Sequence, residues 1–186
     1  MTRDTRTPAE KGIKGATLAV FVEGFRRRDP NAVVNGVLMF AATFLPDIAE
    51  RLYDVEFRPW QRAYADAAML AHAVGMLGPY DETWWWDHVT HAFSATLLGG
   101  LTHVVSRRRG RNSPRDVFAA VVGGGLLWEA MEYTVHSVSD RLGIEPVLVY
   151  YGPYDTVKDL LFNVVGAGLV VAFGDRYLRN LTEDAD

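Results

Sequence analysis

The distribution of charge is the feature that most constrains how this 186-residue chain can fold. Charged residues gather in short clusters, and nearly uncharged apolar stretches separate them. A helix needs about 20 residues, each rising about 1.5 Å, to cross a hydrocarbon core of about 30 Å. With their flanking polar residues included, the apolar stretches therefore predict several membrane-crossing helices. The stretches are residues 32–46, 67–80, 88–106, 117–139 and 160–174.

A water-soluble helical bundle is the alternative interpretation of these stretches. Against it, residues 97–101 and 164–171 are apolar around most of a helix circumference, so they offer little polar face to water. Their glycines and alanines favour close helix packing in lipid. Trp84, Trp85 and Trp86 precede the third stretch, where an aromatic belt at a membrane interface would place them. We therefore predict an all-α, polytopic transmembrane bundle of five or six membrane helices.

Arginine residues predict the orientation of this bundle. They crowd residues 106–116, and the positive-inside rule places such a loop, together with the C-terminus, in the cytoplasm. The N-terminal region is ambiguous, because residues 13–25 can form a sixth crossing or an interfacial helix. We predict a multi-pass protein of the cell membrane, surrounded by the lipid bilayer. Its expected parts are a charged N-terminal segment (1–30), the helical bundle (31–180) and an acidic tail (181–186).

Composition excludes several classes of function. The chain has no cysteine, which rules out disulfides, thiolate metal sites and cysteine nucleophiles. Its net charge of −4 argues against nucleic-acid binding. Neither a Gly-x-Ser-x-Gly elbow nor a phosphate-cradling loop is present.

Residues 47–62 are predicted to form a polar, partly helical connection.

Polar side chains form three stripes on the last three predicted helices, and these stripes carry the candidate site. Residues three or four apart share a helix face. On the first helix that face holds Asp87, His91, Ser94 and Leu98, with His88 about a quarter turn away. On the second it holds Glu129, Glu132, Tyr133 and His136, and on the third Asp155, Asp159 and Asn163. With the predicted topology, the three stripes converge at one depth near the outer boundary of the membrane.

The residue types in the stripes suit two kinds of chemistry. Carboxylates with imidazoles can bind a divalent metal ion such as zinc, manganese or iron. The candidate ligands are Asp87, His91, Glu129, Glu132, His136, Asp155 and Asp159. Without a metal, carboxylate–histidine pairs can perform acid–base catalysis or relay protons, with Glu129, Glu132 and Asp159 as catalytic candidates. The pattern Glu-x-x-His of helix-bundle metal sites is absent, and so is His-Glu-x-x-His.

Structural roles are the competing interpretation. Asp87 and Asp155 stand where aspartate caps a helix. Buried hydrogen bonds between the stripes would also fix the register of the helices. His72 and His103 are expected to be buried or interfacial polar residues without chemistry.

Taken in order, the motifs resemble those of the YjdF-type and VanZ-like families of small prokaryotic membrane proteins. The resemblance covers about residues 84–172. It rests on Trp86-Asp87 with His91, on Trp128-Glu129 with Glu132, and on Asp155-Thr156 with Asp159, Asn163, Gly166 and Ala167. Ala95 departs from the pattern, which leads us to expect glycine after Ser94.

The resemblance implies a role at the cell envelope. VanZ-like proteins are associated with resistance to glycopeptide antibiotics and other agents that act on the envelope. The leading hypothesis is an enzyme that acts on lipid head groups or lipid-linked precursors at the polar site. A proton- or ion-coupled binding or transport protein is the first alternative, and a structural membrane subunit is the second.

Overall fold

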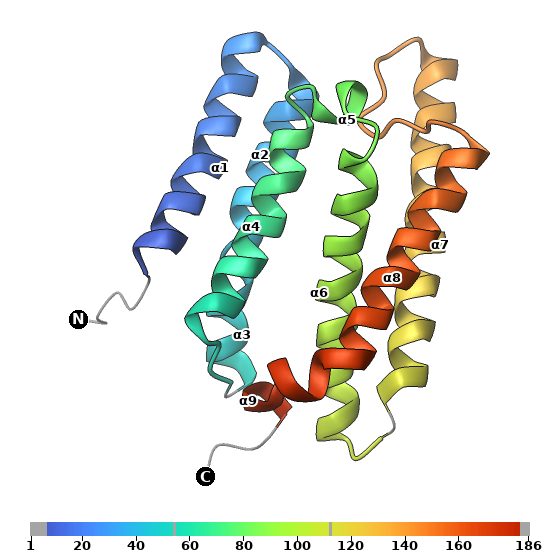
Figure 1. Cartoon of the computed structure of the whole chain (residues 1–186). Coiled ribbons are helices and arrows are strands. Elements are labelled where there is room, and N and C mark those ends of the chain that lie inside the picture. The colour runs from blue at the N-terminus through green and yellow to red at the C-terminus, as the bar shows by residue number, and fades with distance from the viewer. Residues whose placement is uncertain (1–6, 54, 112, 183–186) are drawn as a thin grey trace. The chain divides into compact units, whose positions relative to one another are not determined.

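The computed structural model describes residues 7–53, 55–111 and 113–182 (Figure 1). These residues form helices α1 to α9, and the described ranges contain no β-strand. The prediction of an all-α protein is confirmed. The chain divides into two compact units, the first ending at Trp86 and the second running from Asp87 to Thr182. The predicted acidic tail beyond Thr182 lies outside the described residues.

The first unit consists of α1 (Pro8–Arg27), α2 (Pro30–Ala42), α3 (Leu45–Tyr53), α4 (Pro59–Gly75) and α5 (Pro79–Glu82). Thr7 begins α1 with a capping box, because its hydroxyl accepts from the Glu10 N–H and the Glu10 carboxylate accepts from the Thr7 N–H. The helices α1 and α2 pack closely at Gly24, where an added Cβ would lie 2.9 Å from the Ala32 Cβ. Such contacts between small residues are typical of helices that associate in lipid.

Charged side chains occupy the interior of the first unit. Arg62 on α4 donates to Glu10 at 2.6 Å and to Glu50 at 2.8 Å, and it also pairs with Asp47. A second buried pair, Lys14 and Asp66, lies 3.4 Å apart on α1 and α4. Helices begin and end within the predicted polar connection 47–62, and this segment supplies Asp47, Glu50 and Arg62 to the network. The first unit therefore pairs its buried acids with basic side chains.

The second unit consists of α6 (Trp86–Arg108), α7 (Ser113–Leu142), α8 (Pro153–Tyr177) and the short α9 (Arg179–Thr182). Helix α7 runs antiparallel to α6 and α8 (Figure 1). The hydrophobic core of this unit is small, and α6 and α8 are in tight contact where Ala95 meets Gly166. An added Cβ on Gly166 would lie 2.6 Å from the Ala95 Cβ. The glycine on α8 thus makes room for Ala95 of α6. The core consists of Ala95, Val117, Val121, Ala167 and Val170.

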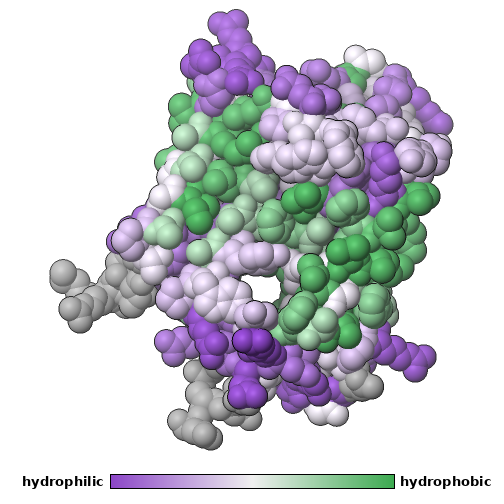
Figure 2. All heavy atoms as spheres, in the orientation of Figure 1, coloured by the Kyte–Doolittle hydropathy of each residue, from purple (hydrophilic) through white to green (hydrophobic). Residues whose placement is uncertain are grey.

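The second unit is apolar outside and polar inside. Three leucines are at least 60% exposed: Leu101, Leu127 and Leu161. In contrast, three polar residues are buried: His88, His103 and Asp159. Figure 2 shows hydrophobic residues over the middle of this unit and hydrophilic residues at its ends. This distribution is the reverse of the usual one in water and suits helices that face lipid.

Two helical segments, Pro30–Tyr53 and Pro153–Tyr177, are long and apolar enough to cross a membrane by themselves. The helices α1, α6 and α7 are also 20 or more residues long, but charged or histidine residues interrupt them. The segment 13–25 lies within α1. The number of crossings, their orientation and the domain limits stay predictions.

Candidate functional site

The candidate site lies at the end of the second unit where α6 and α8 begin (Figure 1). Asp87, His88 and His91 lie in the first two turns of α6, and Asp155 and Asp159 lie in the first two turns of α8. Because α6 and α8 run in the same direction, their first turns meet at the same end. The second half of α7 passes them there.

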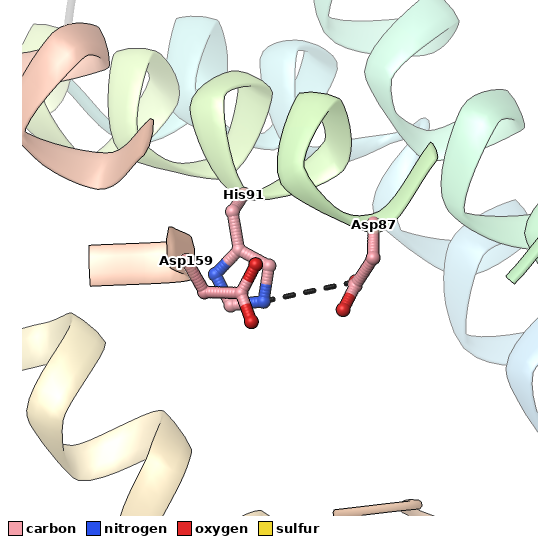
Figure 3. A group of neighbouring side chains, drawn as sticks. All are labelled: Asp87, His91 and Asp159. Atoms are coloured by element: carbon pink, nitrogen blue, oxygen red, sulfur yellow. Dashed lines mark ion pairs between the residues drawn. The ribbon is translucent and has the colours of Figure 1, made fainter. Parts of the chain in front are cut away.

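Asp87, His91 and Asp159 form a first group that can hold a metal ion (Figure 3). Each offers one ligand atom, and these atoms lie within 4.8 Å of one another. His91 Nε2 is 3.7 Å from the Asp87 carboxylate. Asp87 is 23% exposed at its side chain, so this edge of the group is open to the surroundings.

His88, Asp155 and Asp159 form a second group with ligand atoms again within 4.8 Å. His88 Nδ1 is 2.7 Å from Asp159 Oδ1, and both side chains are 2% exposed. The His88 ring also stacks on Phe162, with 5.2 Å between the ring centroids. Helix α8 therefore contacts this imidazole in two ways, through the hydrogen bond to Asp159 and through the stacked ring of Phe162.

Glu129 of α7 brings a carboxylate oxygen that is not hydrogen-bonded. Its Oε2 accepts from the Thr156 hydroxyl at 2.7 Å, but its buried Oε1 has no hydrogen-bond partner. The residue as a whole is 6% exposed. Leaving a buried acceptor unsatisfied costs about 1–3 kcal/mol, and more for a charged group. Such an oxygen calls for a proton or a cation.

One basic side chain, Lys158, acts electrostatically on Asp159 but forms no ion pair with the carboxylates of this site. Five carboxylates approach it, and within residues 87–111 and 113–182 none of them forms an ion pair with lysine or arginine. Asp155 and Glu129 each repel Asp159 electrostatically. Buried charges without partners are expensive in a helix bundle. The excess of negative charge therefore favours the binding of protons or cations at this site. The five carboxylates are Asp87, Glu129, Glu132, Asp155 and Asp159.

The remaining predicted ligands lie differently. Glu132 belongs to neither group: it accepts from the Trp128 indole at 2.7 Å, although its charge interacts with that of Glu129. His136 faces the 143–152 connection, where its Nδ1 accepts from the Tyr150 N–H at 3.2 Å. Its Nε2 is 3.5 Å from Asp140. The structure thus brings together Asp87, His91, Asp155 and Asp159, places Glu129 and Glu132 beside them, and leaves His136 outside.

His88 is absent from the predicted ligand set because the sequence predicts a different buried face of α6. The predicted face is rotated about the helix axis from the face that is buried in the structure. The buried face runs through His88, His91, Ala95, Gly99 and His103, whereas Ser94 and Leu98 are exposed. The small residues that follow His91 at intervals of four are the signal that could have found this face. Small residues mark where neighbouring helices approach most closely.

His103 lies toward the other end of α6 and has no part in this site. It is buried, as predicted, and its Nδ1 is 2.9 Å from the Ser113 hydroxyl at the start of α7. Gly174 on α8 leaves space for the ring, since an added Cβ would lie 3.0 Å from it. The histidine joins the three helices near the arginine-rich connection.

Comparison with known proteins gives one family. The family described as "Predicted membrane protein (DUF2238)" matches residues 12–180, a range that contains every residue of the candidate site. The description confirms the predicted class of protein and names neither the YjdF-type nor the VanZ-like family. No curated protein and no solved structure matches the chain.

Proposed function

Because the chain belongs to the DUF2238 family of predicted membrane proteins, we propose that its second unit binds a divalent cation and acts on a lipid or lipid-linked substrate of the cell envelope. A relationship to the YjdF-type and VanZ-like proteins is part of this proposal. The observation that carries it is the buried Glu129 Oε1, which has no hydrogen-bond partner and lies beside a cluster of carboxylates and imidazoles.

The donor set suits a divalent transition metal. Imidazole nitrogen and carboxylate oxygen together bind zinc, manganese or iron, at about 2.0–2.2 Å from zinc. Two ligands of a tetrahedral zinc ion lie about 3.4 Å apart. The groups, with ligand atoms within 4.8 Å, need only small side-chain rotations to reach this geometry. A cation would also supply positive charge beyond that of Lys158.

The depth of the site supports a substrate with a lipid head group. Asp159 lies six residues after the start of α8, which corresponds to about 9 Å along the helix. Tyr151 and Tyr154 are exposed at this end of the unit, as in the aromatic belt of a membrane interface. Side chains at that depth can reach the polar part of a lipid without entering the centre of the bilayer.

The residues would divide the chemistry between them. A cation held by Asp159 and the histidines would polarise a phosphoryl or carbonyl oxygen of the head group. Glu129 and Glu132 would exchange protons with the reacting groups, since carboxylates near a low-dielectric site are effective general acids and bases.

A second candidate function rests on the His88–Asp159 contact. A buried histidine and carboxylate 2.7 Å apart can pass a proton between them, and acid–histidine pairs mark proton paths in transporters. In that alternative the same carboxylates bind protons or ions for transport and catalyse no reaction.

Reconstitution into liposomes separates these candidates. Wild-type protein in vesicles of bacterial lipids, with Mn²⁺ or Zn²⁺, is assayed for altered head groups by mass spectrometry and for proton or cation flux with fluorescent dyes. Product without flux supports the enzyme, and flux without product supports the transporter. Folded protein that gives neither refutes both and leaves the structural subunit. Glu129→Gln should abolish product, whereas the exposed control Asp140→Asn should leave it unchanged.

A further inference from the structure

The two candidate metal groups share a residue, Asp159, and their other members differ. We infer that the site holds a pair of divalent cations bridged by the Asp159 carboxylate. Asp87 and His91 hold the first cation, and His88 and Asp155 hold the second. This inference rests on the cation binding in the proposed function and adds the stoichiometry, the role of His88 and the substrate class.

The geometry of Asp159 permits a bridge. A carboxylate has two oxygens and can give one to each cation. The hydrogen bond of 2.7 Å from His88 Nδ1 to Oδ1 already directs one oxygen toward the second group. Two ligands of a tetrahedral zinc ion lie about 3.4 Å apart, so this contact has to open by about 0.7 Å. Carboxylate-bridged pairs have their metals about 3.5–4 Å apart.

The helices provide ligands for both positions without bending. On α6, Asp87 and His91 are four residues apart and face the same way, whereas His88 projects to their side. On α8, Asp155 and Asp159 are likewise four residues apart. Each helix thus contributes ligands to both cations. The close contact of α6 with α8 at Gly166 holds the two helices, and with them these ligands, at a fixed separation.

Charge favours two cations over one. The five carboxylates of the site carry five negative charges when ionised and Lys158 acts on Asp159 with one positive charge, so one divalent cation would leave two negative charges uncompensated. Two divalent cations together with Lys158 would balance the five carboxylates. Glu129 belongs to neither group, but its buried oxygen without a hydrogen-bond partner adds to the negative charge that the cations would offset.

A pair of cations at this spacing specifies the substrate class. Two oxygens of one phosphate group can each bind one cation, which is the arrangement used by two-metal phosphatases and nucleases. The substrate is then a lipid that carries a phosphate ester or diphosphate in its head group. Inorganic phosphate should bind across the same pair.

Manganese titration of the purified, detergent-solubilised protein tests the inference. Metal-free wild type is equilibrated with Mn²⁺, bound metal is counted by mass spectrometry, and electron paramagnetic resonance reports exchange coupling between neighbouring ions. We expect about two Mn²⁺ per chain with a coupled spectrum that inorganic phosphate changes. His88→Ala and His91→Ala should each bind about one Mn²⁺ without coupling, and Asp159→Asn should lose the coupled pair. The control His136→Ala should behave as wild type, with circular dichroism verifying the fold of every variant.

Each other outcome has a definite meaning. One Mn²⁺ per chain, unaffected by His88→Ala, overturns the pair but preserves the proposed cation site. Two uncoupled ions overturn the Asp159 bridge. A coupled pair that phosphate does not perturb overturns the substrate class. No bound Mn²⁺, Zn²⁺ or Fe²⁺ in a folded wild type overturns the inference and the proposed metal-dependent function together.

Discussion

The contact between α6 and α8 at Gly166 gives the sharpest prediction about the architecture that supports the site. In Gly166→Ala the new Cβ would lie 2.6 Å from the Ala95 Cβ and 2.8 Å from the Ala92 carbonyl oxygen. Neither atom belongs to a flexible side chain, so the helices themselves have to separate. Gly168→Ala on the same helix is the matched control, because nothing lies within 4 Å of its added Cβ.

The magnitude follows from these distances. Carbon atoms pack optimally at about 3.5–4.0 Å, so the helices must part by about 1 Å. Overpacking of this kind typically costs about 1–3 kcal/mol. The control instead replaces an unhindered helical glycine and should be neutral or stabilise by up to about 1 kcal/mol. Because functional sites tolerate errors of only about 0.5 Å, Gly166→Ala should also weaken Mn²⁺ binding by tenfold or more.

The assay is thermal unfolding in detergent, followed by tryptophan fluorescence, with Mn²⁺ affinity measured on the same samples. Gly166→Ala should unfold at a lower temperature than wild type, and Gly168→Ala at the same or a higher one. If both variants match wild type in unfolding temperature and affinity, the close approach of α6 and α8 is not what holds the site.

Three further predictions test other parts of the molecule. Thr156→Val removes the hydroxyl that donates to Glu129 and should destabilise the metal-free protein by about 1–3 kcal/mol in denaturant titration; an unchanged midpoint would contradict the contact. Arg62→Met leaves buried acids unpaired in the first unit and should cost about 3–5 kcal/mol, whereas Arg26→Met, in an exposed pair, should leave the unfolding temperature unchanged. His136→Ala should accelerate proteolysis of the 143–152 connection without changing metal content, and slower cleavage would refute its anchoring role.

Hydropathy alone predicts the helices of the second unit well. The stretches 88–106, 117–139 and 160–174 lie inside α6, α7 and α8, because a long apolar run has few alternatives to a helix in a nonpolar environment. The intervals of three and four within each stripe likewise anticipate that Asp87 and His91 lie together. These are local relationships, and a single helix fixes them.

Hydropathy and residue spacing do not predict which residues of different helices contact one another. Which face of α6 is buried depends on the small residues that its neighbours contact, so the sequence pattern favours Ser94 and misses His88. In the first unit, Glu10 pairs with Arg62 and Lys14 pairs with Asp66, each across 52 residues. Nothing within either segment indicates its partner, and the charged segment 47–62 therefore reads as a connection rather than as part of a buried network.

The most direct test of the account is the metal content of protein purified from cells in detergent without chelators. Wild type is compared with Glu129→Gln, Asp159→Asn and the control Asp140→Asn, all verified as folded. We predict a stoichiometric divalent metal in wild type and control that is lost in Asp159→Asn and reduced in Glu129→Gln. A folded wild type without metal, which also fails to bind Mn²⁺, Zn²⁺ or Fe²⁺ when these are added, would contradict the central claim that this acidic and histidine site binds a cation.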